Sequence, residues 1–128
     1  MNEKLPRPEF NGKRFRGADK LAVYLVDRGE LRHIPSQTTF DLLFGADWAN
    51  VRVGDPDMNS IPFGRPLAEG TYLARAEGRE DIYLISPFGV KRRLQDKTTL
   101  EKYNFDQSKI KRLSVQELDS FLEGPPVE

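Results

Sequence analysis

An internal repeat is the feature that most limits how this chain can fold. The segment Val23-Tyr24-Leu25-Val26 recurs as Ile82-Tyr83-Leu84-Ile85, and each copy is followed by a glycine and then by an arginine. The glycines are Gly29 and Gly89, and the arginines are Arg32 and Arg92. Apolar and turn residues keep matching at an offset of 59 to 60 residues along the chain. A repeat of this length predicts two tandem copies of one supersecondary unit.

Each copy begins with the pattern of a β-hairpin. Residues 15–26 and 72–85 are rich in β-branched, aromatic and leucine residues on either side of a polar turn, which is typical of two antiparallel strands. A second reversal follows at Gly29 or Gly89, where we expect a positive φ. The next strand is short, over residues 31–34 in the first copy and 90–94 in the second.

A short helix follows in each copy. Ser36 and Asp96 stand where N-caps belong, because their side-chain oxygens can accept from the free N–H groups of a first turn. They predict helices over residues 39–43 and 99–103.

The last part of each copy combines a strand with a helical turn. Residues 51–53 and 110–113 are expected to form short strands. Asp55 before a proline predicts a capped turn, and Ser114 with Glu117 three residues later has the pattern of a capping box.

The repeat length also bears on the domain organisation. A unit of about 55 residues buries little apolar surface alone, so we expect the two copies to share a core as one compact domain. The predicted fold is α+β, with two tandem β-rich repeats, short helices, antiparallel strands and a pseudo-twofold arrangement. Repeat 1 is placed at residues 12–66 and repeat 2 at residues 70–124, with flexible tails at 1–11 and 125–128.

The composition excludes several kinds of chemistry. The chain has 128 residues and no cysteine, so it offers no disulfide, thiol nucleophile or thiolate metal ligand. Twenty basic residues balance 20 acidic ones, which gives no overall attraction to nucleic acid. The strip 91–112 has eight basic residues against three acidic ones, and we interpret it as a solvated face. No catalytic residue, metal site or cofactor is predicted.

Membrane segments are also not expected. No apolar run reaches the roughly 20 residues of a membrane-spanning helix. The first residues are polar and contain prolines, and they have no apolar run of signal-peptide length. We therefore expect no membrane span and, by default, a cytoplasmic location.

Three weak chemical signals have simpler interpretations. His33 could act as a base or a metal ligand near neutral pH, but no second histidine or cysteine completes a metal shell, which favours a surface histidine. Asp55, Asp57 and Asn59 match the first oxygen positions of a calcium loop, but the glycine and the final glutamate are missing, which favours helix capping. Paired carboxylates for glycoside hydrolysis are a weak third signal, because distant aspartates can meet in space, and the default interpretation is that these aspartates are solvated. The aspartates concerned are Asp27, Asp47, Asp81 and Asp106.

Two loops at equivalent places have the composition of a sugar-binding surface. Residues 45–50 and 104–108 each combine an aromatic ring with carboxylate and amide side chains. A sugar can lay its apolar face on such a ring and bind its hydroxyls to the polar groups. The alternative is that both rings fill the core beneath a helix. The candidate ligand-binding residues are Asp47, Trp48, Asn50, Asn104, Phe105 and Asp106.

The order of these motifs resembles a short tandem repeat of bacterial surface and cell-wall-associated proteins. In the first copy the motifs are V-Y-L, then G, R-x-I-P-S, D-W, V-x-V and I-P-x-G. The second copy departs from the pattern, because Gln95 and Asp96 replace Pro35 and Ser36 and no tryptophan matches Trp48. The resemblance implies a binding or structural module and assigns no catalytic residue.

Two hypotheses for function follow. The first is a noncatalytic, lectin-like module that holds a carbohydrate or a cell-envelope polymer through duplicated surfaces, since two linked weak sites raise the apparent affinity. The alternative is an intracellular protein–protein interaction or scaffold domain, which the absence of a signal-peptide pattern and the many short strands favour.

Overall fold

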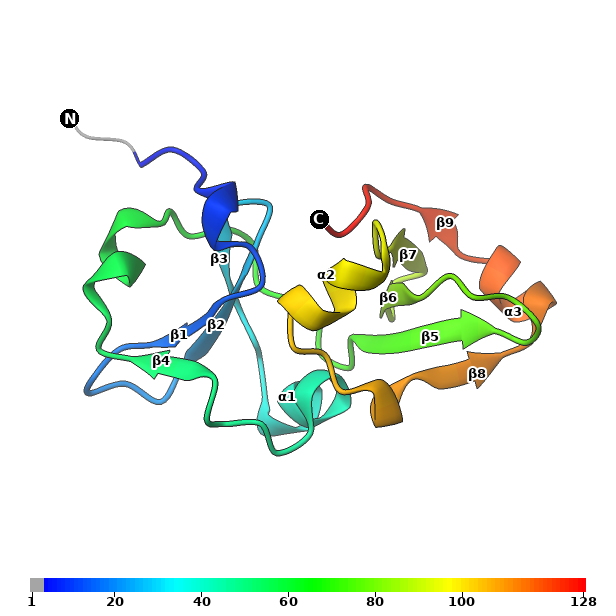
Figure 1. The fold of residues 1–128 in the computed structure, drawn as a ribbon, viewed down its shortest axis with the longest axis horizontal. Coiled ribbons are helices and arrows are strands. Elements are labelled where there is room, and N and C mark those ends of the chain that lie inside the picture. The colour runs from blue at the N-terminus through cyan, green and yellow to red at the C-terminus, as the bar shows by residue number, and fades with distance from the viewer. Residues whose placement is uncertain (1–3) are drawn as a thin grey trace.

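Two β-sheets with a shared strand topology form the molecule, and helices α1 and α2 lie between them (Figure 1). The computed structural model describes residues 4–128, and its mixture of strands and short helices confirms the predicted α+β class. The first half contains η1 (Pro8–Phe10), β1 (Arg14–Arg16), β2 (Val23–Asp27), β3 (Glu30–His33), α1 (Gln37–Phe44), β4 (Val51–Val53) and η2 (Pro56–Ser60). The second half contains β5 (Tyr72–Ala76), β6 (Tyr83–Ser86), β7 (Val90–Arg93), α2 (Lys97–Lys102), η3 (Gln107–Lys109), β8 (Lys111–Leu113), α3 (Val115–Asp119) and β9 (Leu122–Glu123).

Four strands pair in the same way in both halves, and β9, which pairs with β7, has the isolated bridge between Leu31 and Phe63 as its counterpart in the first half. The order is β3-β2-β1-β4 in the first sheet and β8-β5-β6-β7-β9 in the second. Phe15 lies opposite Tyr24, and Ala74 lies opposite Tyr83, which is a shift of 59 residues for both partners. The two hairpins of each half are antiparallel as predicted. β4 and β8 pair in parallel with β1 and β5, because the connection through a helix returns the chain in the same direction.

The turn between β2 and β3 explains why the repeat offset changes from 59 residues in β2 to 60 residues in β3, and the offset returns to 59 residues in β4. In the first half Asp27 pairs with Glu30, which leaves a two-residue loop in which both residues have positive φ. In the second half Ser86 pairs with Val90, which leaves a three-residue loop that ends in a glycine of φ 96°. Both are favoured hairpin connections. The predicted positive φ at Gly29 and Gly89 is confirmed.

The helix N-caps match the predictions, and α1 and α2 each begin two residues before the predicted range. The Ser36 hydroxyl and the Asp96 carboxylate each accept the N–H three residues ahead at 3.1 Å, and the Ser114 hydroxyl does so at 3.0 Å. The full reciprocal capping box lies at α2, where the Thr99 side chain accepts a hydrogen bond from the backbone N–H of Asp96. For α3 the structure gives the serine half alone within the described residues. Asp55 caps η2 by accepting the Asp57 N–H at 2.9 Å, so capping accounts for this aspartate.

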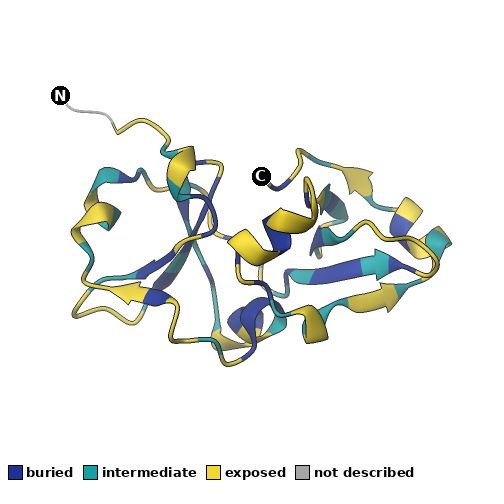
Figure 2. Ribbon diagram, viewed as in Figure 1, coloured by how far each residue is buried: buried dark blue, intermediate teal, exposed yellow. Residues whose placement is uncertain are grey.

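The main core lies between the sheets and draws on both halves. Leu25 from β2, Leu84 from β6 and Phe40 from α1 belong to one buried cluster. In Figure 2 the buried segments include α1, most of β5 and parts of the first sheet. The outer face of each sheet has its own smaller cluster, to which Met58 of η2 contributes in the first half and Leu118 of α3 in the second.

The predicted tail at residues 125–128 is wrong. Val127 is fully buried in the shared core. The carbonyl of Glu128 accepts hydrogen bonds from the Asn11 side-chain amide at 3.1 Å and from the Tyr103 hydroxyl at 2.8 Å. The prolines before Val127 indicate fraying when they are read alone, but the apolar contact and the buried donors fix this segment.

The predicted tail at residues 1–11 is likewise wrong for its described part. The Arg7 N–H donates to the Gly29 carbonyl at 2.9 Å, and Phe10 packs against the outer cluster of the first sheet. Residues 1–3 lie outside the described residues.

Candidate functional site

A buried arginine holds the first candidate loop in place. Arg14 of β1 is 1% exposed and donates to the carboxylate and to the carbonyl of Asp47, both at 2.8 Å. Its guanidinium lies 4.0 Å from the centre of the Phe44 ring. The Asn50 amide donates to the same carboxylate at 2.9 and 3.0 Å. Asp47 and Asn50 therefore bind each other and Arg14, and they form the support of the loop.

The electrostatics of this pair favour its charged form. Burial acts to raise the pKa of the Asp47 carboxyl, but hydrogen bonds from Asn50 and Arg14 outweigh it, so this pKa lies below its ordinary value. Burial lowers the pKa of the Arg14 guanidinium, and Asp47 opposes that effect. A carboxylate whose pKa is lowered in this way is poorly suited to act as a general acid.

The second candidate loop is part of the core. Phe105 is 5% exposed and stacks on Phe44 and on Tyr103, with ring centres 5.4 and 5.2 Å apart. The prediction of Phe105 as a sugar platform is wrong, because its ring fills the space between the repeats. The Asp106 N–H donates to the Leu43 carbonyl at 2.9 Å, so the loop is fastened to the end of α1.

Asn104 and Asp106 have structural roles at helix ends. Asn104 has φ 55° and follows α2, as Gly45 with φ 60° follows α1. Asp106 caps η3 by accepting from the hydroxyl and the N–H of Ser108 at 2.7 and 2.9 Å. These bonds lower the pKa of its carboxyl. The six predicted residues therefore do not form one binding surface.

Trp48 is the predicted residue that stays accessible while it borders a concave surface. Its side chain is 45% exposed and lies flat on Phe40 of α1, with ring centres 3.9 Å apart and planes 2° apart. We call the adjoining hollow groove 1. It has a volume of about 370 Å³ and is lined by residues 21–23, residues 33–37, Phe40 and Trp48.

Repeat 2 has a groove at the equivalent place. Groove 2 has a volume of about 530 Å³ and is lined by residues 80–82, residues 93–97, Leu100 and Gln107, with Arg75 and Glu101 in addition. Adding 59 or 60 to the number of each of the ten residues of groove 1 gives a residue of groove 2. The repeated backbone therefore builds the same concave surface twice, between a hairpin loop, a strand end and a helix start.

The two grooves differ in chemistry. Groove 1 is lined by apolar and uncharged polar side chains together with His33, and it includes Leu21, which is 93% exposed. At the equivalent positions groove 2 has Glu80 for Leu21, Arg93 for His33 and a glutamine for the tryptophan. A neutral, aromatic surface has thus become a surface with charges of both signs.

His33 belongs to groove 1 and contacts Tyr24, with ring centres 5.4 Å apart and planes tilted by 48°. It is half-buried at the edge of the sheet. Within residues 4–128 no group of three or more histidine, aspartate or glutamate side chains is placed to hold a metal ion.

Asp27, one of the four aspartates considered for hydrolysis, is an interior ion-pair partner. It is 1% exposed and accepts from Arg92 at 2.6 and 3.0 Å and from Arg32 at 2.7 Å. Burial acts to raise the pKa of its carboxyl, but Arg92 and then Arg32 outweigh it and hold this pKa below its ordinary value. Because Arg32 and Arg92 are equivalent positions of the repeats, this carboxylate joins the two halves.

Comparisons with known proteins give one partial similarity. No family model matches the chain, and no solved structure matches it. The chain is similar to Protein CgeD of Bacillus subtilis (strain 168), with 27% identity over 123 residues, which is 96% of this chain. The chain spans 28% of the length of that relative. No helix in residues 4–128 is long and apolar enough to cross a bilayer.

Most of the groove residues were not predicted from the sequence, although the repeat contains a signal for them. Positions 21 and 80 and positions 48 and 107 are equivalent in the repeat but differ sharply in polarity. Equivalent positions whose burial does not restrict their side chains can differ in this way, so such pairs indicate an exposed surface of the repeated unit.

Proposed function

We propose that the protein is a noncatalytic binding module with a duplicated groove, and that groove 1 binds a neutral carbohydrate. The observation that supports this proposal is the formation of one concave surface at equivalent positions of both repeats.

The side chains of groove 1 suit a sugar ring. The outer face of the Trp48 indole can stack on the apolar face of a sugar, since its inner face already rests on Phe40. His33 and Gln37, at the strand end and the start of α1, can hydrogen-bond to hydroxyl groups. The volume of about 370 Å³ lies within the range of small-molecule sites.

The duplication suits a polymer with many binding positions, such as a component of the cell envelope. When one groove is occupied, the second meets the same polymer at a high effective concentration. Two weak contacts then give useful affinity without a deep pocket.

The test measures binding and stability together. Wild-type protein, Trp48→Ala and Gln107→Ala are titrated with tetramers of glucose and of N-acetylglucosamine, and unfolding midpoints are recorded for each variant. We expect Trp48→Ala to lose binding of the neutral sugar and to lose about 1 kcal/mol of stability, because half of the indole is buried against Phe40. Gln107→Ala should leave neutral sugar binding unchanged.

Phe63→Ala is the matched control. Phe63 is 63% exposed and lies outside both grooves, so its loss removes an aromatic ring without changing groove 1. Equal loss of sugar binding in Phe63→Ala and Trp48→Ala would contradict the proposal. So would a stable Trp48→Ala variant that binds as the wild type does.

One observation favours a protein partner as the second candidate. The Phe63 and Tyr24 rings pack edge to face, with ring centres 5.3 Å apart and planes 64° apart, and Tyr24 in turn contacts His33 of groove 1. The aromatic surface therefore extends past the groove, which suits a peptide with several apolar side chains. Capture of an apolar peptide that both Phe63→Ala and Trp48→Ala abolish would favour this alternative.

A further inference from the structure

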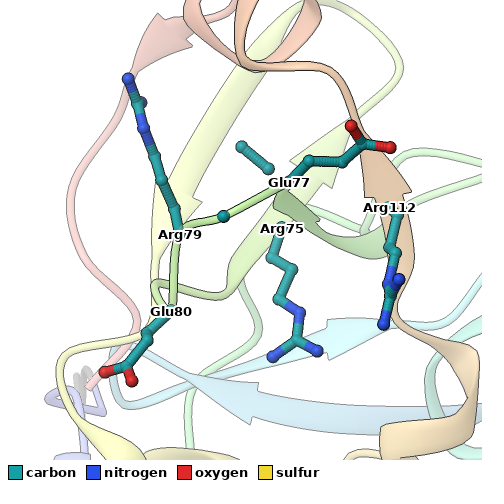
Figure 3. Close-up of a pocket in the computed structure, with 7 residues that line it drawn as sticks. Arg75, Glu77, Arg79, Glu80 and Arg112 are labelled. Carbon is teal, nitrogen blue, oxygen red and sulfur yellow. The ribbon is translucent and has the colours of Figure 1, made fainter.

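Repeat 2 carries a pair of arginines on neighbouring strands. Arg75 of β5 lies opposite Arg112 of β8 in the parallel pairing, so both side chains project from the same face of the sheet. Figure 3 shows the two guanidinium groups pointing the same way, while Arg79 points away from them. A hollow of about 400 Å³ adjoins the pair and is also lined by Glu77 and Glu80.

Neither member of the pair is neutralised within residues 4–128. Arg79, beside them, forms an ion pair with Asp119 at 3.2 Å. No such ion pair and no hydrogen bond of the guanidinium is found for Arg75 or Arg112 in this part of the chain. Like charges directly across neighbouring strands destabilise a sheet, and an anion bound between them removes that repulsion.

The equivalent place in repeat 1 lacks this pair. Arg16 and Val53 occupy the same register there. The Arg16 guanidinium donates to the Lys20 carbonyl at 2.8 Å, and Val53 is an exposed apolar side chain. The arginine pair is therefore not a requirement of the repeated sheet, which forms without it.

We propose that Arg75 and Arg112 form an anion site for a phosphate group, either free or as an ester. Two guanidinium groups match the charge of a phosphate dianion, and their planar forks can each donate to its oxygens. Arg75 and Glu80 line both this hollow and groove 2, so a phosphate held here lies at one end of that groove. The inference goes beyond the proposed function and stands whether or not groove 1 binds sugars.

The test is a titration followed by NMR at constant ionic strength. Inorganic phosphate and glycerol 3-phosphate should shift the backbone amide signals of residues 75–80 and 111–113 in a saturable way. Arg112→Gln should weaken binding about tenfold or more, because a charge-assisted hydrogen bond is lost, and Arg75→Gln/Arg112→Gln should abolish it. Raising the salt concentration should weaken binding, since this site is exposed to solvent.

The matched control is Arg16→Gln/Lys20→Gln, which removes the same two charges from the equivalent part of repeat 1. It should change the affinity for phosphate by less than about twofold, because distant surface charges are screened. Unchanged binding in the double variant of repeat 2, equal loss in the control, or no saturable shift in the wild type would overturn the proposal. Acetate bound as tightly as phosphate would overturn the choice of ligand. If the double variant fails to fold, the exposed single variant Arg112→Gln decides the question.

Discussion

The two repeats pair their strands in the same way but bury different groups. Arg14 of β1 and Leu73 of β5 occupy the same place in the register, opposite Leu25 and Leu84, and both are almost completely buried. Asp27 at the end of β2 corresponds in the same way to a serine at the end of β6. Because repeat 2 forms this sheet with a leucine and a serine, the topology does not require the charges of repeat 1.

The charges of repeat 1 have other roles. Arg14 fixes the loop that carries Trp48, and Asp27 holds one arginine from each repeat. In repeat 2 many charged side chains lie instead in groove 2 and around the arginine pair. Its buried charged residue is Lys91, whose ammonium group donates to the Leu118 carbonyl at 3.1 Å.

The largest effect should come from the carboxylate that joins the repeats. Asp27→Ala is expected to lose about 3 to 5 kcal/mol of stability, because Arg92 and Arg32 would be left largely buried without a counter-charge. Urea denaturation measures the loss. Asp119→Ala, which removes an exposed partner of Arg79, should cost less than about 1 kcal/mol. If the two variants lose the same free energy of unfolding, the Asp27 carboxylate does not stabilise the contact between the repeats.

A second pair of variants tests the equivalence of Arg14 and Leu73. Arg14→Ala should lose about 3 kcal/mol, since it leaves a cavity and removes the partner of Asp47. Arg14→Leu should lose about 1 kcal/mol or less, because the equivalent position accepts leucine and Asp47 keeps Asn50 and access to water. The fluorescence of Trp48, the single tryptophan, should shift to longer wavelength in both variants. Equal destabilisation by alanine and leucine would break the comparison.

The hairpin glycines should also respond differently. Both Gly29 and Gly89 have positive φ. A Cβ added at Gly29 would lie 2.5 Å from the backbone nitrogen of Arg7, whereas a Cβ added at Gly89 would have no other atom within 4 Å. Gly29→Ala should therefore cost about 2 kcal/mol and Gly89→Ala about 1 kcal/mol. Thermal unfolding gives both values. An equal cost would show that the segment before β1 moves freely out of the way.

The smallest effect concerns acid. The pKa of the Asp27 carboxyl is lower in the folded protein than in the unfolded chain, so its contribution to stability is complete above the unfolded pKa of about 3.9. That contribution is lost as the pH falls through the folded pKa. Stability measured from pH 5 downward should thus fall more steeply in the wild type than in Asp27→Asn. Parallel curves of stability against pH for the two proteins would contradict a lowered pKa for Asp27.

Local signals allowed much of the fold to be predicted. Residue type alone predicts the N-caps at Ser36 and Asp96, because their side chains accept from backbone N–H groups, and the turns at Gly29 and Gly89, because glycine adopts a positive φ. The parallel pairing of β4 with β1 was not predicted, because a three-residue strand carries no sign of its partner. The burial of Val127 was not predicted for a related reason, since one apolar residue next to prolines forms no periodic pattern.

The candidate site was harder to predict than the fold. Trp48 and Phe105 sit in loops of similar composition, yet one indole face is open and the other ring is buried. The choice depends on which helix end each loop meets in space. Arg14 was not predicted as a buried residue, because it precedes the predicted hairpin of residues 15–26 and an arginine normally faces solvent, whereas in the structure it is enclosed by Phe44 and Asp47.

The core that spans both sheets has a consequence for cooperativity. Leu25 and Leu84 belong to one cluster, and Asp27 links the halves by charge, so we expect the chain to unfold in a single transition. A ligand bound in either groove then raises the unfolding temperature of the whole molecule. Heat-based screening would report occupancy without indicating the half in which it occurs, and the location must come from variants confined to one groove.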